Sequence, residues 1–288
     1  MTDMTLETQL IENTFYEGER PLFACENMTL EKVRFYPGES ALKHSKHVVA
    51  RACEFLCKYP FWHSDNVLLE DNVFTVYGRA AIWYTQNVVM RHCKVDAPKM
   101  FRKVSHVSVE NTVFSSAGET FWWCDNITLD TVQLRGADYV FMHGEHIEIN
   151  DMHMQGNYSF QEAKNVVIRN SHLESKDAFW ESENVTVYDS VLDGEYLGWH
   201  SKNLRLVNCT IRGEQPFCYC ENLVLENCVM SDDAELGFEY SSVEADIKSH
   251  VVSIKNPKSG YIRAKSVGEI ILDEHRITPS ECTIETEE

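Results

Sequence analysis

The chain repeats a pattern of residues about every 19 to 21 positions, and this repeat constrains the fold more than any other feature of the sequence. Each repeat begins with a polar residue, followed by Asn or His and then by alternating apolar residues. The repeats begin at Glu26, Lys46, Asp65, Gln86, Ser105, Asp125, Glu145, Lys164, Glu183, Lys202, Glu221 and Ser242. Self-similarity of this length indicates a stack of similar turns, each packed on its neighbours, and not a conventional globule.

Each turn is expected to contain three short strands. Apolar and polar residues alternate after the Asn or His, as in the stretch around Val185 and Val187, and such alternation is typical of a strand. An Asn or Asp with a small residue then marks a corner before a second strand. A third element closes the turn, and it carries a large apolar residue four positions before the next repeat begins. We therefore predict an all-β fold, a right-handed single-stranded parallel β-helix with three short strands per coil and about eleven regular coils.

Two columns of residues should stack along such a helix, because residues one period apart become neighbours when the turns are in register. The first column is aromatic and is expected inside. It contains Phe61, Ile82, Phe101, Phe121, Phe141, Phe160, Phe179, Gly198, Phe217 and Phe238. The second column consists of the Asn residues near the start of each repeat, such as Asn184 and Asn203. We expect these Asn side chains to form a ladder of amide hydrogen bonds.

Two other repeat architectures fit the pattern less well. A leucine-rich repeat has a similar length, but its consensus needs a leucine that these repeats lack, and it does not end in an aromatic strand. A left-handed helix of hexapeptides needs a six-residue period, which the corners of this chain do not keep.

A single domain is expected, because the repeat continues through most of the chain. Residues 1–25 should form an N-terminal cap and partial coil, residues 26–241 the β-helix repeats, and residues 242–288 an irregular C-terminal coil and cap. Within the last segment, residues 251–254, 261–264 and 269–272 still have the pattern of strands. Pro257 and Gly260 interrupt the spacing there.

Charge and targeting features exclude several classes of partner. The chain has 45 acidic and 26 basic residues, and a net charge of −19 repels phosphate backbones and anionic membranes. No nucleic acid and no membrane partner is therefore expected. Residues 1–9 have neither a basic start nor an apolar run, so no export signal is indicated and a cytoplasmic location is favoured.

The ten cysteines are interpreted as small buried residues, since Cys53, Cys93, Cys209 and Cys228 share one column of the repeat. Cys218 and Cys220 are too close together for the usual zinc knuckle, and no second pair stands at zinc spacing. No metal and no cofactor is predicted.

Two adjacent columns carry the side chains most relevant to function. The first contains Lys43, Trp62, Trp83, Arg102, Trp122, Met142, Gln161, Trp180, Trp199 and Cys218. The second contains His44, His63, Tyr84, Lys103, Trp123, His143, Glu162, Glu181, His200, Tyr219 and Tyr240. Alternation places the first column outside if the Phe column is inside. For the second column, strict alternation points inward whereas its charges favour an outward corner.

If both columns face outward, one side of the helix offers indole rings beside acidic and imidazole groups. Flat aromatic rings suit the apolar faces of sugars, whose hydroxyls pair with polar neighbours. The predicted ligand-binding residues are Trp62, Trp83, Trp122, Trp180, Trp199 and Tyr84. The predicted catalytic residues are Glu162, Glu181, His143 and His200, because a carboxylate pair one turn apart can supply an acid and a base. Two other interpretations stay open, namely packing of the aromatic residues against one another and, with a less suitable geometry, metal binding by the His and Glu residues. His92, His153 and His172 are interpreted as scattered exterior residues.

The repeat of Asn and aliphatic residues, then Asn or Asp with Cys or Ser, then Phe-Trp, resembles the pectate-lyase-like superfamily of right-handed β-helices. It resembles more closely a bacterial β-helix family known only as a domain of unknown function. The resemblance covers residues 22–240 and implies a fold in which many proteins bind, cleave or isomerise polysaccharides. His143 with Gly144 matches one polygalacturonase motif, but the remaining motifs of those enzymes are missing. No catalytic residue is carried over from them.

The sequence therefore predicts a carbohydrate-binding or carbohydrate-active protein that uses its Trp-rich face. Whether it is an enzyme stays open, with glycoside hydrolase, lyase and isomerase chemistry as the candidate reactions. The alternative is a non-enzymatic scaffold in which the same face binds another protein or a second copy of the chain in a homo-oligomer.

Overall fold

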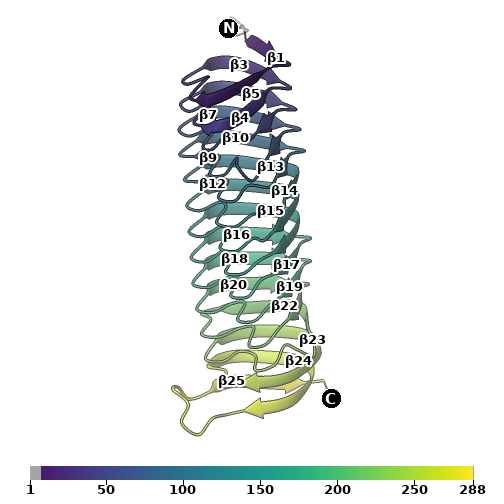
Figure 1. Ribbon diagram of the computed structural model, residues 1–288. Helices are drawn as coiled ribbons and strands as arrows, with labels where there is room; N and C mark the ends of the chain where they lie inside the picture. The colour runs from purple at the N-terminus through teal and green to yellow at the C-terminus, as the bar shows by residue number, and fades with distance from the viewer. Residues whose placement is uncertain (1–7, 288) are drawn as a thin grey trace, which may run out of the picture. The chain divides into compact units, whose positions relative to one another are not determined.

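The computed structural model describes residues 8–287. In this range the chain contains 25 β-strands and no helix, so no helix there could cross a membrane. The N-terminal residues 1–7 of the expected cap, and the final residue of the acidic tail, lie outside the described residues. The chain divides into two compact units, Met1–Gly136 and Ala137–Glu288. Within each unit, parallel strands stack turn upon turn (Figure 1).

Seven turns make up Met1–Gly136. Their first strands are β1 (Gln9–Glu12), β3 (Glu26–Glu31), β5 (Lys46–Arg51), β7 (Asp65–Glu70), β10 (Gln86–Arg91), β13 (Ser105–Phe114) and β14 (Asp125–Arg135). Separate second strands are β2 (Phe15–Glu19), β4 (Arg34–Glu39), β6 (Glu54–Phe55), β8 (Val73–Phe74) and β11 (Lys94–Val95). Two short third strands are β9 (Ile82–Trp83) and β12 (Phe101–Arg102).

Eight turns make up Ala137–Glu288. Their first strands are β15 (Glu145–Gln155), β16 (Lys164–Arg169), β18 (Glu183–Tyr188), β20 (Lys202–Val207), β22 (Leu223–Met230), β23 (Ser242–Lys255), β24 (Ser259–Ile271) and β25 (Glu281–Thr286). Separate second strands are β17 (His172–Glu174), β19 (Val191–Asp193) and β21 (Thr210–Arg212).

The predicted fold class is confirmed, and the structure is an all-β, right-handed parallel β-helix. The number of turns is larger than the eleven expected, because β1 precedes the regular repeats and β23, β24 and β25 follow them. β23, β24 and β25 pair in parallel like the earlier turns, so residues 242–286 are more regular than expected. Here β23 and β24 each run through the position of the first corner. Neither strand has a left-handed residue there, unlike β13, β14 and β15, which also run through this corner but keep Asn111, Thr131 and Asp151.

The interior follows the predicted columns. β16, β18 and β20 pair so that Val166, Val185 and Leu204 lie in register, and each is buried. The aromatic column is also confirmed inside each unit. Phe101 and Phe121 stack at 4.8 Å between ring centroids, and Phe141 stacks on Phe160 at 4.6 Å. Residues one period apart are therefore spatial neighbours, as the repeat requires.

The corners of each turn have left-handed backbone conformations, which explains the polar residues that recur there. Asn184 has a φ of 57° and Asn203 a φ of 54°. Asn tolerates this conformation better than most residues because its short side chain bonds locally. The Asn column is therefore selected by backbone geometry as well as by hydrogen bonding.

Among the described side chains, the expected Asn ladder is found in only one of the units. In Ala137–Glu288, Asn184 donates to Asn165 at 3.1 Å, Asn203 donates to Asn184 at 2.8 Å, and Asn222 donates to Asn203 at 3.0 Å. In Met1–Gly136 the prediction is wrong, since Asn87 donates to the Asp65 carboxylate at 2.9 Å. His residues interrupt the Asn column there, and a neighbouring carboxylate is the stronger acceptor.

The cysteines are free thiols, and eight of the ten are buried. Burial raises the pKa of Cys57 and Cys93 to about 12. The interpretation of the cysteines as small buried residues is confirmed for these positions. A thiol with such a pKa stays neutral.

Candidate functional site

The two columns singled out in the sequence face outward except at Cys218, which is buried, and the backbone explains why. Trp83 follows buried Ile82 and is half-buried at the surface. The next residue, Tyr84, has a φ of 58°, so the chain turns a corner instead of returning inward as strict alternation would require. Thr85 then points into the core and is fully buried. Tyr84 is 40% exposed, and the equivalent Trp123 is 44% exposed.

In Met1–Gly136 the first column forms a continuous stack, here called the aromatic–cation column. It consists of Lys43, Trp62, Trp83, Arg102 and Trp122. The rings of Trp62 and Trp83 lie 5.2 Å apart at an angle of 8°. The guanidinium carbon of Arg102 lies 4.4 Å from the centre of the Trp83 ring and 4.5 Å from that of Trp122. Lys43 Nζ lies 5.9 Å from the ring of Trp62. These are cation–π distances, so the cations pack between or beside the rings.

Hydrogen bonds hold the indoles of this column in place. Trp62 Nε1 donates to the carbonyl oxygen of Ala80 at 2.6 Å, and Trp83 Nε1 donates to that of Lys99 at 2.7 Å. Glu119 accepts a hydrogen bond from Arg102 at 3.3 Å and also pairs with the Lys99 amine at 2.9 Å. The rings and the guanidinium are therefore pre-positioned by neighbouring turns.

The adjacent column in this unit, here called the corner column, consists of His44, His63, Tyr84, Lys103 and Trp123. The His44 and His63 rings stack at 5.1 Å, and the His63 and Tyr84 rings stack at 4.9 Å. Lys103 Nζ lies 5.9 Å from the rings of both Tyr84 and Trp123. Burial lowers the pKa of His63, and repulsion from His44 and Lys43 adds to this effect.

The ring geometry defines how a ligand could use this surface. Parallel rings in full contact are separated by about 3.5 to 4.0 Å. The larger centroid distance between Trp62 and Trp83 means that each ring is offset and covers only part of the next. Tyr84 is turned 82° from the Trp83 ring. The indoles are thus packed against one another, as the packing interpretation expects, and they also stay half-exposed.

The two predicted binding residues in Ala137–Glu288 have different surroundings. Trp199 packs against Tyr196 at 5.1 Å and against Tyr219 at 6.3 Å. The indole nitrogen of Trp180 is buried and has no hydrogen-bond partner among the described residues. Trp180 and Trp199 therefore do not continue a stack like that of Trp62 and Trp83.

The four predicted catalytic residues occupy successive corners of this unit. His143, Glu162, Glu181 and His200 all have φ between 53° and 55°, so their side chains leave the helix at equivalent positions. Of these four described side chains, only His143 and Glu162 form an ion pair, with 3.2 Å between Nδ1 and Oε2. Glu181 lies one turn beyond Glu162, whose amide donates to the carbonyl oxygen of Trp180 at 2.9 Å.

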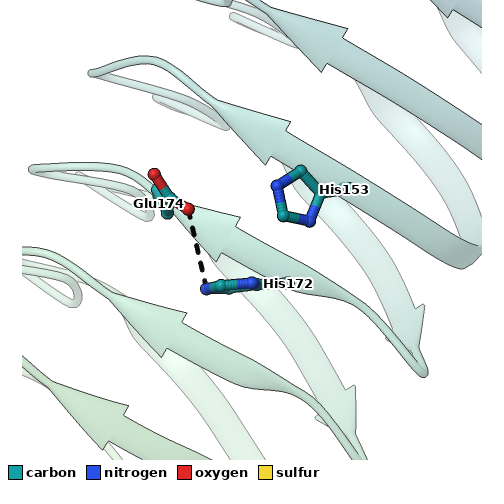
Figure 2. A group of neighbouring side chains, drawn as sticks. All are labelled: His153, His172 and Glu174. Atoms are coloured by element: carbon teal, nitrogen blue, oxygen red, sulfur yellow. Dashed lines mark ion pairs between the residues drawn. The ribbon is translucent and has the colours of Figure 1, made fainter.

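Sequence reasoning missed a second cluster on the same unit. His153, interpreted as a scattered exterior residue, pairs in register with His172, and Glu174 lies two residues further along the same strand (Figure 2). The interval of 19 residues between the two histidines equals one period of the repeat, and this spacing was the signal that could have found them.

The fold and the outer columns define a class of protein, namely a right-handed parallel β-helix whose surface carries stacked aromatic rings and cations. A family model described as "Protein of unknown function (DUF3737)" matches residues 9–285. The chain belongs to this family, as the sequence resemblance implied. No curated protein matches the chain significantly.

Several solved structures are similar to the chain in fold. PfbA, a surface adhesin of Streptococcus pneumoniae, is 10% identical with a TM-score of 0.49, and the match covers 97% of this chain and 86% of PfbA. The A-module of mannuronan C-5 epimerase AlgE4 from Azotobacter vinelandii is 8% identical with a TM-score of 0.37, over 96% of this chain and 91% of the module. A family 28 exopolygalacturonase of Yersinia enterocolitica is 9% identical with a TM-score of 0.37, over 97% of this chain and 73% of the enzyme. No residue of the candidate site is assigned from these similarities.

Proposed function

We propose that the protein binds a carbohydrate along the aromatic–cation and corner columns of Met1–Gly136. The half-exposed indoles of Trp62 and Trp83 supply apolar surface for the C–H faces of a sugar. Arg102 and Lys103 supply hydrogen-bond donors for its oxygen atoms. The combination of aromatic rings and a few placed polar groups is what a sugar site requires.

Charge favours an acidic sugar over a neutral one. The two columns contain the cations Lys43, Arg102 and Lys103 and no anionic side chain, although the whole chain carries a net charge of −19. A uronate carboxylate would therefore meet Lys43, Lys103 and Arg102 on an otherwise acidic protein. Of these cations, Arg102 is already paired with Glu119.

The observation that carries the proposal is the position of Arg102 between two indoles. Stacking covers the two faces of the guanidinium, and its Nε atom is buried and has no hydrogen-bond partner among the described residues. Only Glu119 is bonded to the N–H donors of the group in the described structure. A planar guanidinium held in this way still has Nη donors for a second carboxylate, such as that of a uronate.

A fluorescence titration tests this proposal, with oligogalacturonate as the acidic probe and a maltooligosaccharide of the same length as the neutral one. We expect saturable quenching or enhancement with the acidic probe. Arg102→Gln should weaken binding about tenfold or more, since a hydrogen bond to a charged group contributes roughly 1.5 to 3 kcal/mol. Trp83→Ala should also weaken binding, because it removes the ring that packs on the sugar. Trp199→Ala, in the other unit, is the matched control and should leave binding unchanged. Equal binding of both probes, or full binding by Arg102→Gln, would contradict the proposal.

A reaction on a sugar bound at Ala137–Glu288 is a second candidate, favoured by the 3.2 Å pair of His143 and Glu162 in that unit. An imidazole and a carboxylate in contact can move a proton, as hydrolase, lyase and isomerase chemistry all require. Product analysis of oligogalacturonate incubated with the protein tests this candidate. Any activity should be lost in Glu162→Gln, with Glu183→Gln, at the start of β18 on another turn, as the control.

The scaffold alternative uses the same aromatic surface to bind a second copy of the chain. Light scattering distinguishes the two cases. A dimer that dissociates in Trp62→Ala would favour assembly, whereas a monomer that binds the acidic probe favours the carbohydrate site.

A further inference from the structure

Two imidazoles and one carboxylate meet on the outer surface of Ala137–Glu288. Strand β15 pairs in parallel with β17, and this register places His153 directly beside His172. Leu173 is fully buried, so the residues on either side of it, His172 and Glu174, both point outward. Figure 2 shows the three side chains gathered on the same face of neighbouring strands.

The ligand atoms of the three residues are close together. His172 Nε2 lies 3.9 Å from Glu174 Oε1, and the two imidazole rings lie 5.0 Å apart at an angle of 89°. One potential ligand atom from each residue lies within 4.8 Å of the other two. The perpendicular rings allow nitrogen atoms of both histidines to approach one point.

His172 provides a second, independent observation. Its Nε2 atom is shielded from solvent and has no hydrogen-bond partner among the described residues. An unsatisfied buried polar atom costs roughly 1 to 3 kcal/mol, and such atoms are uncommon in folded proteins. Binding of a cation between the three residues would satisfy this nitrogen.

We propose that His153, His172 and Glu174 bind one divalent transition-metal ion, of which Zn²⁺ is the representative probe. Imidazole nitrogen and carboxylate oxygen suit zinc and its neighbours, whereas calcium and magnesium prefer oxygen ligands alone. Zn–N and Zn–O distances of about 2.0 to 2.2 Å place two ligand atoms roughly 3.5 Å apart. Side-chain rotations that close the present distances by about 1 Å achieve this geometry. Three protein ligands leave one coordination position for water or an external ligand.

Two other histidine groups among the described residues lack one part of this arrangement. His92 Nδ1 lies 3.9 Å from Asp71, the same distance as in the pair of His172 and Glu174, but it has no second imidazole beside it. His44 and His63 stack in parallel beside Lys43, whose charge repels a cation.

The thiols offer little competition for the ion. Even the two cysteines that are partly exposed, Cys25 and Cys282, have pKa values raised to about 11 by burial. A neutral thiol is a poor metal ligand.

Calorimetric titration of the EDTA-treated full-length protein with Zn²⁺ at neutral pH tests the proposal. We expect one equivalent to bind with an affinity that His172→Gln and Glu174→Gln each lower by at least 10- to 100-fold, the loss typical even for second-shell partners. His92→Gln is the matched control, because it removes a histidine with the same carboxylate distance, and it should leave the affinity unchanged. Circular dichroism checks that each variant is folded.

A second measurement keeps the proposal testable if a variant does not fold. In the wild-type protein, the ring ¹⁵N resonances of two histidines should shift together as one equivalent of Zn²⁺ is added. Unchanged affinity in His172→Gln, an equal loss in His92→Gln, or no shift of paired histidine resonances would overturn the proposal. The test is independent of carbohydrate binding.

Discussion

The two units share one kind of core but present different outer columns. In Met1–Gly136 the outer columns combine indoles with Lys and Arg, and Arg102 packs between Trp83 and Trp122. In Ala137–Glu288 the equivalent positions combine imidazole and carboxylate, as in the pair of His143 and Glu162. The inward columns differ far less, because both units stack Phe rings along the interior.

This difference separates the demands of folding from those of function. Inward residues must fill the same cross-section on every turn, so they are restricted to aliphatic and aromatic side chains. Outward residues contact only the turns above and below and can vary without disturbing the fold. The surface chemistry of each unit is therefore the place to look for its ligand.

The largest expected effect tests whether the cores are equivalent. Phe101→Ala and Phe160→Ala each remove a buried ring stacked on its neighbour, at 4.8 Å and 4.6 Å respectively. Each substitution should lower the free energy of unfolding by about 3 to 5 kcal/mol, the usual cost of truncating a buried Phe. Urea denaturation followed by circular dichroism measures this. A loss below about 1 kcal/mol for either variant would show that the two cores differ.

A smaller effect compares the Asn positions of the two units. Asn184 makes two ladder bonds and Asn87 makes one to a carboxylate, and both have left-handed φ. Asn184→Ala should cost about 2 kcal/mol, from strain of roughly 1 to 2 kcal/mol and the lost bonds. Asn87→Ala should cost somewhat less. Asn184→Gly is the control, since it removes the bonds without the strain, and a Gly variant less stable than Ala would contradict this account.

A third prediction uses the contrast between two indole nitrogens. Trp83→Phe loses the hydrogen bond to the carbonyl oxygen of Lys99 and should lower the free energy of unfolding by about 1 kcal/mol. Trp180→Phe removes a buried donor that has no partner, so it should be neutral or stabilising. Thermal denaturation of both variants measures the difference. Equal destabilisation would mean that the indole of Trp180 finds a partner in solution.

The smallest effect concerns pH. Burial lowers the pKa of His63 in the folded protein, with His44 and Lys43 contributing, so the unfolded chain binds a proton more readily. Stability should therefore fall as the pH drops below about 6.5, the ordinary value for His. His63→Gln should reduce this decline, which is measured as the difference in Tm between about pH 5 and about pH 7.5. A larger decline in the variant would reverse the expected sign.

The sequence alone was sufficient to predict the architecture. A period of 19 to 21 residues with internal alternation specified stacked turns, and buried positions such as Val185 and Phe160 followed from it. The physical reason is that inward side chains at equivalent positions have the same environment on every turn. The same types of residue therefore recur along the sequence. The number of turns was underestimated where β23 and β24 run straight through a corner, because the repeat is not visible there.

Only the tertiary structure decided which way the side chains of the outer columns point and which residues they contact. Alternation could not orient Tyr84 or Glu162, because each has a left-handed backbone that turns the chain at a corner. The neighbours of each outward side chain lie on the adjacent turns. Arg102 packs between two indoles in this way, and His153 lies beside His172. Such contacts depend on side-chain directions at the surface, which neither period nor composition specifies.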